Sequence, residues 1–195
     1  MINRDDTKLA GFVFKGQMTS LQIDKLLAKS SPTAKMSFDD IAGKVSLALL
    51  DEEAVADAQK MSAVYIAIAS FENMVRDLIA SRLLEEKGAN WWDVCVNSDV
   101  KKRSEDRRKQ EEQIRWHQAR GLNPIYFTEI SDLLSIIQGN WAYFVDLIHD
   151  VEWARTIFKT IDRSRNVIMH SGQLSMNDIE RLGMLIRDWL RQVGG

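Results

Sequence analysis

The chain has 195 residues, of which 45% are hydrophobic, and this suits one globular domain with its own core. Its 26 basic and 28 acidic residues leave a formal net charge of -2, so any contact with a nucleic acid must be local. The single cysteine, Cys95, excludes an intramolecular disulfide, and without a cluster of cysteine and histidine no structural zinc site is expected.

Targeting and membrane signals are missing from the sequence pattern. The first residues, MINRDDTKLAGFVFKGQ, lack the apolar core of a signal peptide, and no stretch approaches the ~20 apolar residues of a membrane span. We therefore expect a soluble, cytoplasmic protein with no membrane partner and no cofactor. The two prolines, Pro32 and Pro124, lie between segments with helical periodicity, which favours an all-α fold.

Residues 1–45 are interpreted as an N-terminal extension, for which the sequence indicates no role. AGFVFKG has the pattern of a short strand, whereas SLQIDKLLAKS and SFDDIAGKVS have the pattern of short helices. Residues 46–195 are expected to form the helical domain.

The domain begins with a long predicted helix from about Ser46 to Lys87, either continuous or made of two helices joined near Asp51. Gly88 is expected to end this helix, because glycine readily adopts the left-handed turn after a helix. Apolar residues recur at intervals of three and four, as on one helix face, at Val64, Ile68, Phe71, Val75, Leu78 and Ile79.

A charged segment follows at about 97–120 and includes KKRSEDRRKQEEQ. Both signs of charge alternate there and apolar residues are almost absent, so the segment is interpreted as a charged insertion, either a solvated helix or a mobile loop. In both cases we expect it to be exposed.

The remaining helices are predicted in the C-terminal third of the chain. Helical spacing of apolar residues marks segments 127–137 and 150–170, and a segment rich in large apolar residues begins at Asn140 between them. SGQLSMNDIERL then predicts a turn and a last helix, whose first N–H groups Ser175 or Asn177 can cap. Four to five helices are expected to pack as a bundle.

Among the three histidines, His170 stands at a predicted helix end, a few residues after Arg163 and Arg165. At ~100° per residue, Arg163 lies about 20° from His170 around the helix, whereas Arg165 lies about 140° away. Asn166 shares a face with His170 at i,i+4. Helix geometry alone therefore favours Arg163 as the partner of His170.

Three blocks of sequence resemble a bacterial branch of the HEPN superfamily. YIAIASFENMVRDLIASRLLEEKGANWW resembles its first core helix and turn, with Glu72 and Arg76 in the expected places, and GLNPIYFTEISDLLSIIQGNW resembles its next helical segment. RNVIMH is similar to the superfamily's signature of an arginine, a polar residue, a few further residues and a histidine. The resemblance covers about residues 55–192 and implies an HEPN-like helical bundle, although the charged segment at 99–115 is longer and more polar than in that pattern.

The resemblance also implies a chemistry, namely metal-independent cleavage of RNA by attack of a ribose 2′-hydroxyl on the adjacent phosphodiester. His170 would transfer protons, and Arg165 would stabilise charge on the phosphate. Arg165 is preferred because Asn166, the polar residue of the signature, follows it directly and would orient a partner or contact the ribose. Arg163 remains a competitor, with a supporting or phosphate-binding role.

Glu72 and Arg76 have two interpretations. They form either an exposed i,i+4 ion pair, worth ~0.3–0.5 kcal/mol, or a brace that holds the signature helix from across the bundle. We assign them a supporting or phosphate-binding role rather than catalysis.

Two functions follow from the resemblance. The first is an HEPN endoribonuclease in a toxin–antitoxin or phage-defence system, working as a homodimer on RNA and restrained by an antitoxin or another regulatory protein. The second is a non-catalytic HEPN module that binds a partner protein or a nucleotide. An enzyme is expected to bring Arg165, Asn166 and His170 together at an accessible groove.

Overall fold

The computed structural model describes residues 36–114, 116–118 and 120–194, and every regular element in these ranges is helical. The all-α bundle predicted from the sequence is thus confirmed. The α-helices are α2 (Phe38–Lys44), α3 (Glu52–Lys87), α4 (Trp91–Cys95), α5 (Ser98–Glu112), α6 (Ile130–Gly139), α7 (Val151–Met169) and α8 (Met176–Val193). Short 3₁₀ turns lie at Leu47–Leu49, Gly88–Asn90, Pro124–Phe127 and Trp141–Tyr143.

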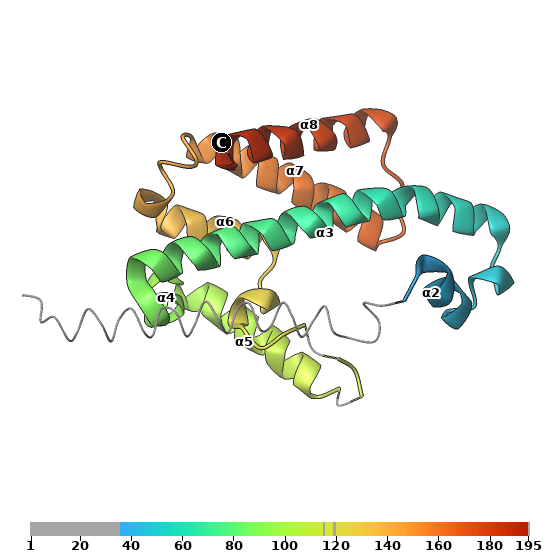
Figure 1. The fold of residues 1–195 in the computed structure, drawn as a ribbon, viewed down its shortest axis with the longest axis horizontal. Coiled ribbons are helices and arrows are strands. Elements are labelled where there is room, and N and C mark those ends of the chain that lie inside the picture. Colours follow the sequence, from blue (N-terminus) through green and yellow to red (C-terminus); the bar gives the residue numbers. More distant parts are fainter. Residues whose placement is uncertain (1–35, 115, 119, 195) are drawn as a thin grey trace, which may run out of the picture.

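Helix α3 runs the length of the bundle and packs against α6 and α7 (Figure 1). It begins after Asp51, whose carboxylate accepts a hydrogen bond from the Ala54 N–H at 2.9 Å. It ends at Gly88, whose φ of +68° lies in the left-handed region, as predicted. The 3₁₀ turn at Leu47–Leu49 is separate, so the chain breaks at Asp51 and the helix beyond it is continuous.

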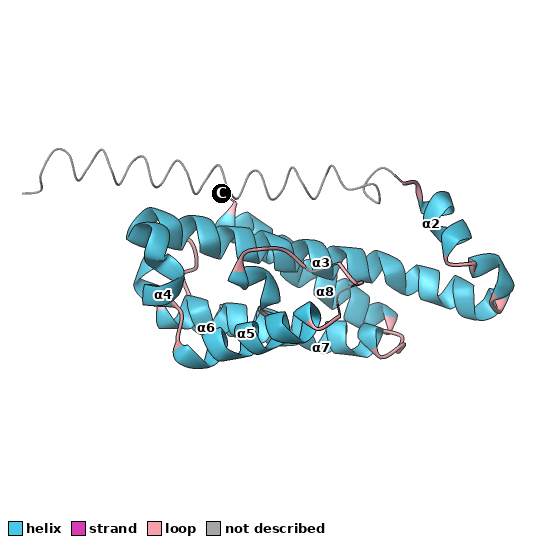
Figure 2. Cartoon of the chain, turned by 90° about the horizontal axis from the view of Figure 1, so that it is seen from below, coloured by secondary structure: helices cyan, strands magenta, loops and turns pink. Residues whose placement is uncertain are grey.

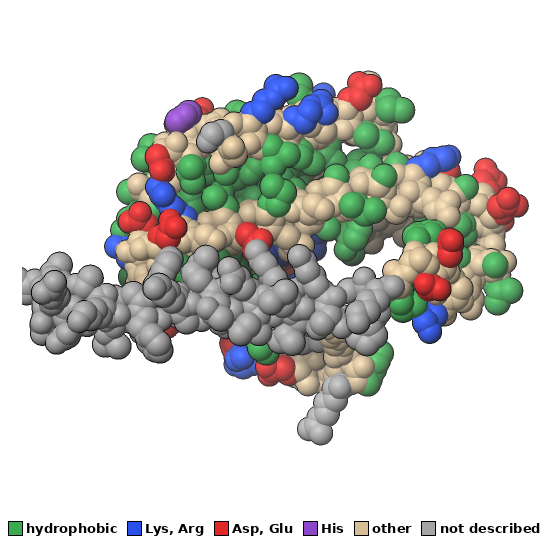
Figure 3. Space-filling view, viewed as in Figure 1, with side chains coloured by type: hydrophobic (Ala, Val, Ile, Leu, Met, Phe, Trp, Pro, Cys, Tyr) green, Lys and Arg blue, Asp and Glu red, His purple; other side chains and the backbone are tan. Residues whose placement is uncertain are grey.

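Helices α7 and α8 are antiparallel and pack on one another, joined by a tight turn (Figures 1 and 2). Trp189 of α8 lies against Phe71 of α3 and Phe158 of α7, with ring centroids 5.6 and 5.3 Å away in edge-to-face geometry. Hydrophobic side chains gather along the seam between α8 and α3 (Figure 3). Each buried aromatic side chain contributes about 1.5–3 kcal/mol, so this cluster fixes the orientation of α7 and of its polar end.

Helix α5 contains the charged segment that the sequence predicts to be exposed, and the structure corrects that expectation in part. One face of α5 is docked against the 3₁₀ turn at Pro124–Phe127. Val100 and Ser104 are buried, and the Ser104 hydroxyl donates a hydrogen bond to the Pro124 carbonyl oxygen at 2.7 Å. The segment is therefore a helix anchored on one side and solvated on the other.

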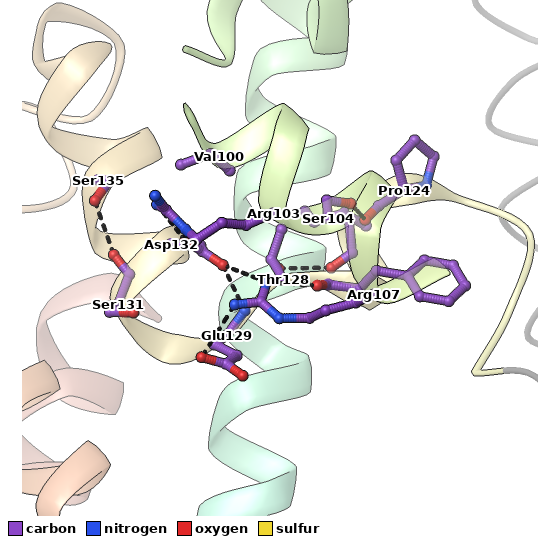
Figure 4. A network of polar contacts seen from close by, with 12 residues as sticks. Val100, Arg103, Ser104, Arg107, Pro124, Thr128, Glu129, Ser131, Asp132 and Ser135 are labelled. Atoms are coloured by element: carbon purple, nitrogen blue, oxygen red, sulfur yellow. Dashed lines mark hydrogen bonds and ion pairs between the residues drawn. The ribbon is translucent and has the colours of Figure 1, made fainter. Parts of the chain in front are cut away.

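The anchor is a network of charges centred on Asp132, a buried residue of α6 (Figure 4). Its carboxylate accepts hydrogen bonds from Arg103 Nη2 at 2.6 Å and from Arg107 Nη1 at 2.8 Å. The Arg107 guanidinium also donates to the Phe127 carbonyl oxygen at 2.9 Å. Buried charges are tolerated only when they are paired. Arg103 and Arg107 therefore hold α5 against α6 through Asp132, although α5 has almost no apolar residues of its own to pack there.

The network also affects the pKa of Asp132. Burial alone would raise the pKa of the carboxyl, but hydrogen bonds from Arg103, from the Glu129 backbone N–H and from Arg107 outweigh it. The pKa is therefore lowered from its usual value, and Asp132 is a carboxylate at neutral pH.

The structure describes the N-terminal extension from Met36 onward. The prediction of a short helix in SFDDIAGKVS is confirmed by α2, in which the Ser37 hydroxyl accepts a hydrogen bond from the Asp40 N–H at 3.1 Å. The expected strand AGFVFKG and the expected helix SLQIDKLLAKS lie outside the described residues.

Candidate active site

The last turns of α7 present two faces. Arg163, Asn166 and His170 share one face, as their spacing of three, four and seven residues requires. All three are exposed. Arg165 lies on the adjacent face, with 27% of its side chain exposed, and is directed toward α3. Within one chain, the three residues of the signature therefore do not meet at a single groove.

Arg165 contacts Glu72 of α3, with 3.8 Å between its Nε and a carboxylate oxygen. Among the described residues its guanidinium makes no hydrogen bond. The other oxygen of Glu72 accepts a hydrogen bond from Arg76, whose guanidinium also donates to Asn73 Oδ1 at 2.9 Å and to the Thr128 carbonyl oxygen at 2.8 Å. Glu72 thus joins α3 to the signature helix.

The interpretation of Glu72 and Arg76 as an exposed ion pair is wrong. Only 10% of each side chain is exposed, because the pair is on the face of α3 that contacts Arg165 of α7 and Thr128 before α6. Removing either partner would leave a buried charge without its counterion, so the pair is far more costly to break than a surface pair.

Positive charge is concentrated around Glu72. Burial lowers the pKa of Arg76, Glu72 counteracts this, and the charges of Arg120 and Arg165 lower the pKa further. Arginine remains charged at neutral pH despite such shifts. The Nε of Arg76 is buried and has no hydrogen-bond partner. Arg120 and Arg165 are therefore close enough to Arg76 for their charges to act on it, and Glu72 lies beside Arg76 and Arg165.

These arginines line a cavity of about 300 Å³, which we call the arginine cavity. Its polar lining consists of Tyr65, Glu72, Asn73, Arg76, Arg120, Tyr126 and Arg165. Arg120 reaches it from the segment after α5 and is paired with Glu111, which does not line the cavity. Gly121 is needed next to Arg120, because a Cβ there would lie 2.8 Å from the Tyr126 ring.

His170 is the C-terminal cap of α7, with its backbone N–H donating to the Asn166 carbonyl oxygen at 3.2 Å. In the described part of the chain its imidazole makes no hydrogen bond, and it lines neither neighbouring hollow. Met169 before it lines the arginine cavity, and Ser171 after it lines a groove of about 590 Å³ between the first half of α3 and the α7–α8 turn. His170 therefore lies between two hollows.

Arg163 is exposed and, unlike Arg165, does not line the arginine cavity. A hydrogen bond from Ser175 is the main cause of the lowered pKa of Asp178, at the start of α8, and the positive charge of Arg163 contributes to it. The charge of Arg163 thus acts on the start of α8, whereas Arg165 contacts Glu72 of α3.

Two further observations concern metals and membranes. Within residues 36–114, 116–118 and 120–194, no group of three His, Cys, Asp or Glu side chains is placed to hold a metal ion. None of the helices in the same ranges combines the length and the apolar character required to cross a membrane.

The family model described as Swt1-like HEPN matches residues 67–194, about two thirds of the chain. The chain belongs to the Swt1-like HEPN family. No curated protein and no solved structure matches it. The HEPN resemblance predicted from the sequence is thus confirmed, and the HEPN match spans Glu72, Arg76, Arg120, Arg165 and His170.

Sequence reasoning missed four polar residues that line the arginine cavity, namely Tyr65, Asn73, Arg120 and Tyr126. Arg120 lies in the segment interpreted as an exposed insertion, and no periodic pattern connects it to α3 or α7. The only signal was local, because the pair Arg120–Gly121 ends a charged run shortly before Pro124.

Proposed function

We propose that the protein is an endoribonuclease that cleaves RNA without a metal ion, with Arg165 and His170 as its catalytic pair. One observation supports this most strongly. The helix that places Arg165 in a positively charged cavity ends at His170, which is exposed and whose imidazole makes no hydrogen bond in the described part of the chain. Membership in the HEPN family supports the same assignment.

The chemistry requires a general base and a charge-stabilising group. A ribose 2′-hydroxyl loses its proton and attacks its own 3′ phosphodiester, and the bond to the 5′ oxygen of the next nucleotide breaks. The products are a 2′,3′-cyclic phosphate and a 5′-hydroxyl. His170 transfers the proton, which typically contributes 10²–10⁴-fold, and Arg165 stabilises the charge that develops on the phosphate oxygens. Asn166, exposed beside His170, contacts the ribose or orients the imidazole.

The working unit in this proposal is a homodimer. Arg165 and His170 point to different sides of α7, so a second copy that faces the end of α7 would supply one group of each pair. Such a twofold contact is self-complementary and is expected to bury at least ~1,000 Å². Light scattering tests the oligomer, and mixed dimers of wild type with His170→Ala test whether the cleft is shared.

The setting we propose is toxin–antitoxin or phage defence in the cytoplasm, with an antitoxin or other regulatory protein restraining the nuclease. Kinship with HEPN domains is the support for this setting. A protein that binds over His170 and the groove beside it would block the site without entering the core.

The alternative is a non-catalytic HEPN module that binds a partner protein or a nucleotide. One observation favours it: Arg165 contacts Glu72, and the imidazole of His170 makes no contact with Arg165 in the described structure. Fold membership alone does not separate the two functions.

One experiment separates them. Wild type and His170→Ala are incubated with total RNA in EDTA, and the new RNA ends are mapped. The proposal predicts cyclic phosphate ends with wild type and none with the variant. Cleavage that EDTA stops, or full activity of His170→Ala, would contradict it, and complete inactivity of a homodimeric wild type would favour the non-catalytic module.

A further inference from the structure

The geometry of the arginine cavity points to a further assignment. We infer that it binds one phosphate group of a single-stranded RNA, through Arg76, Arg120 and Arg165, with Tyr65 as the stacking surface for an adjoining base. This inference rests on the proposed function, because it takes the ligand to be a substrate strand.

The charge of the lining favours an anion. Three guanidinium groups and one carboxylate, Glu72, face the cavity, which leaves a formal charge of +2, or +1 when Glu111, which pairs with Arg120, is included. The whole chain carries -2, so this cavity is a local positive site on an acidic protein. A phosphate would reduce the repulsion among the three arginines.

Unused hydrogen-bond donors point the same way. The guanidinium of Arg165 approaches Glu72 only to 3.8 Å, beyond hydrogen-bond distance. The Nε of Arg76 has no partner, although 90% of that side chain is buried. Buried donors are nearly always satisfied in native proteins, so the arrangement has capacity for an oxyanion.

The size of the cavity and its walls limit the ligand. About 300 Å³ is at the small end of ligand sites, enough for a phosphate with its ribose but not for a duplex. Tyr65 is 46% exposed and lines both this cavity and the groove beside Ser171. A strand with one phosphate in the cavity therefore has an aromatic surface for its next base, along a path that passes the end of α7.

The test is equilibrium binding of an uncleavable 2′-O-methyl RNA tetranucleotide, with inorganic phosphate as a second probe. Arg120→Ala is expected to weaken both probes about tenfold or more, since a charge-assisted hydrogen bond is lost. The matched control is Arg108→Ala, an arginine of α5 paired with Glu105 outside the cavity, which removes the same charge and should change neither. Equal effects of Arg120→Ala and Arg108→Ala would overturn the assignment.

Two further variants identify the ligand class. Tyr65→Ala should weaken the tetranucleotide about fivefold or more and leave inorganic phosphate unchanged, because only the former carries bases. Glu72→Gln should strengthen both probes, because it removes the negative charge that competes with phosphate and keeps an acceptor for Arg76. Circular dichroism verifies that both variants are folded. Unchanged tetranucleotide binding by Tyr65→Ala, or weaker phosphate binding by Glu72→Gln, would contradict the inference.

Binding and cleavage are measured on the same proteins, so the two proposals can fail separately. His170→Ala should bind inorganic phosphate like wild type, because its imidazole does not line the cavity. If the probes bind as expected but wild type does not cleave RNA, the phosphate site is supported and the nuclease proposal is rejected. If wild type cleaves RNA but Arg120→Ala binds both probes normally, the nuclease proposal is supported and the phosphate site is rejected.

Discussion

In the part of the chain that the structure describes, arginines cluster around two buried carboxylates, Asp132 and Glu72, and the two clusters differ in how completely their groups are paired. Around Asp132, two arginines donate to both carboxylate oxygens, and a backbone N–H donates as well. Around Glu72, Arg165 stays at 3.8 Å and the Nε of Arg76 is unpartnered. Both clusters join two helices, but only the second borders the arginine cavity.

The difference indicates which cluster is saturated by its own contacts and which has donors available for a ligand. A fully paired buried charge has no capacity left, and removing one member leaves the others uncompensated. An incompletely paired cluster retains donors and electrostatic potential for an incoming anion. We therefore expect changes at Asp132 to alter stability and changes around Arg165 to alter activity.

The largest expected effect is on cleavage. Arg165→Ala should reduce the rate of RNA cleavage at least about 100-fold, the cost typical of losing a group that stabilises transition-state charge, with little change in melting temperature. Arg163→Ala is the matched control, because Arg163 lies two residues away, is exposed and does not line the arginine cavity, and it should cost much less. Measured rates with the opposite ranking would mean that helical phase, rather than the HEPN signature, selects the arginine.

A large effect on stability is expected from Asp132→Ala. The substitution leaves Arg103 and Arg107 without their shared carboxylate and should lower the free energy of unfolding by about 3 kcal/mol. Urea denaturation measures the change, and phosphate binding at the arginine cavity should persist below the transition. A change under about 0.5 kcal/mol would show that the two clusters do not differ as described.

Neighbouring arginines sharpen the same comparison. Arg107 has 18% of its side chain exposed and contacts Asp132, whereas Arg108 has 43% exposed and pairs with Glu105 on the solvent side. Arg107→Ala should cost about 2 kcal/mol and Arg108→Ala less than about 0.5 kcal/mol, the value typical of surface pairs. Equal melting temperatures for the two variants would mean that α5 is not anchored through Asp132.

The smallest expected effect is a dependence of stability on acid. Because the pKa of Asp132 is lowered in the fold, its contribution is fully present above the usual aspartate pKa of ~3.9 and is lost as pH falls through the lowered value. Between about pH 4 and 2 the melting temperature of wild type should therefore fall more steeply than that of Asp132→Asn. Parallel curves would indicate that the network does not stabilise the carboxylate.

The helices themselves were determined by local sequence. Apolar residues at helical spacing, the Asp51 and Ser175 caps and the left-handed Gly88 fixed where α3 and α8 begin and where α3 ends, because these signals act within one or two turns. The segment 150–170 was likewise predicted nearly to its ends. The RNVIMH signature was readable for the same reason, since its residues lie within one helix.

Only the tertiary structure determined which residue from a distant segment each charged side chain contacts. Alternating charges in α5 have the pattern of a solvated helix, and nothing local indicates that Arg103 reaches Asp132, 29 residues away. Arg120 enters the same cavity as Arg76 and Arg165 although it is separated from both by more than 40 residues. An ion pair between two distant elements needs only one residue from each element. It therefore produces no periodic pattern in the sequence from which it could be predicted.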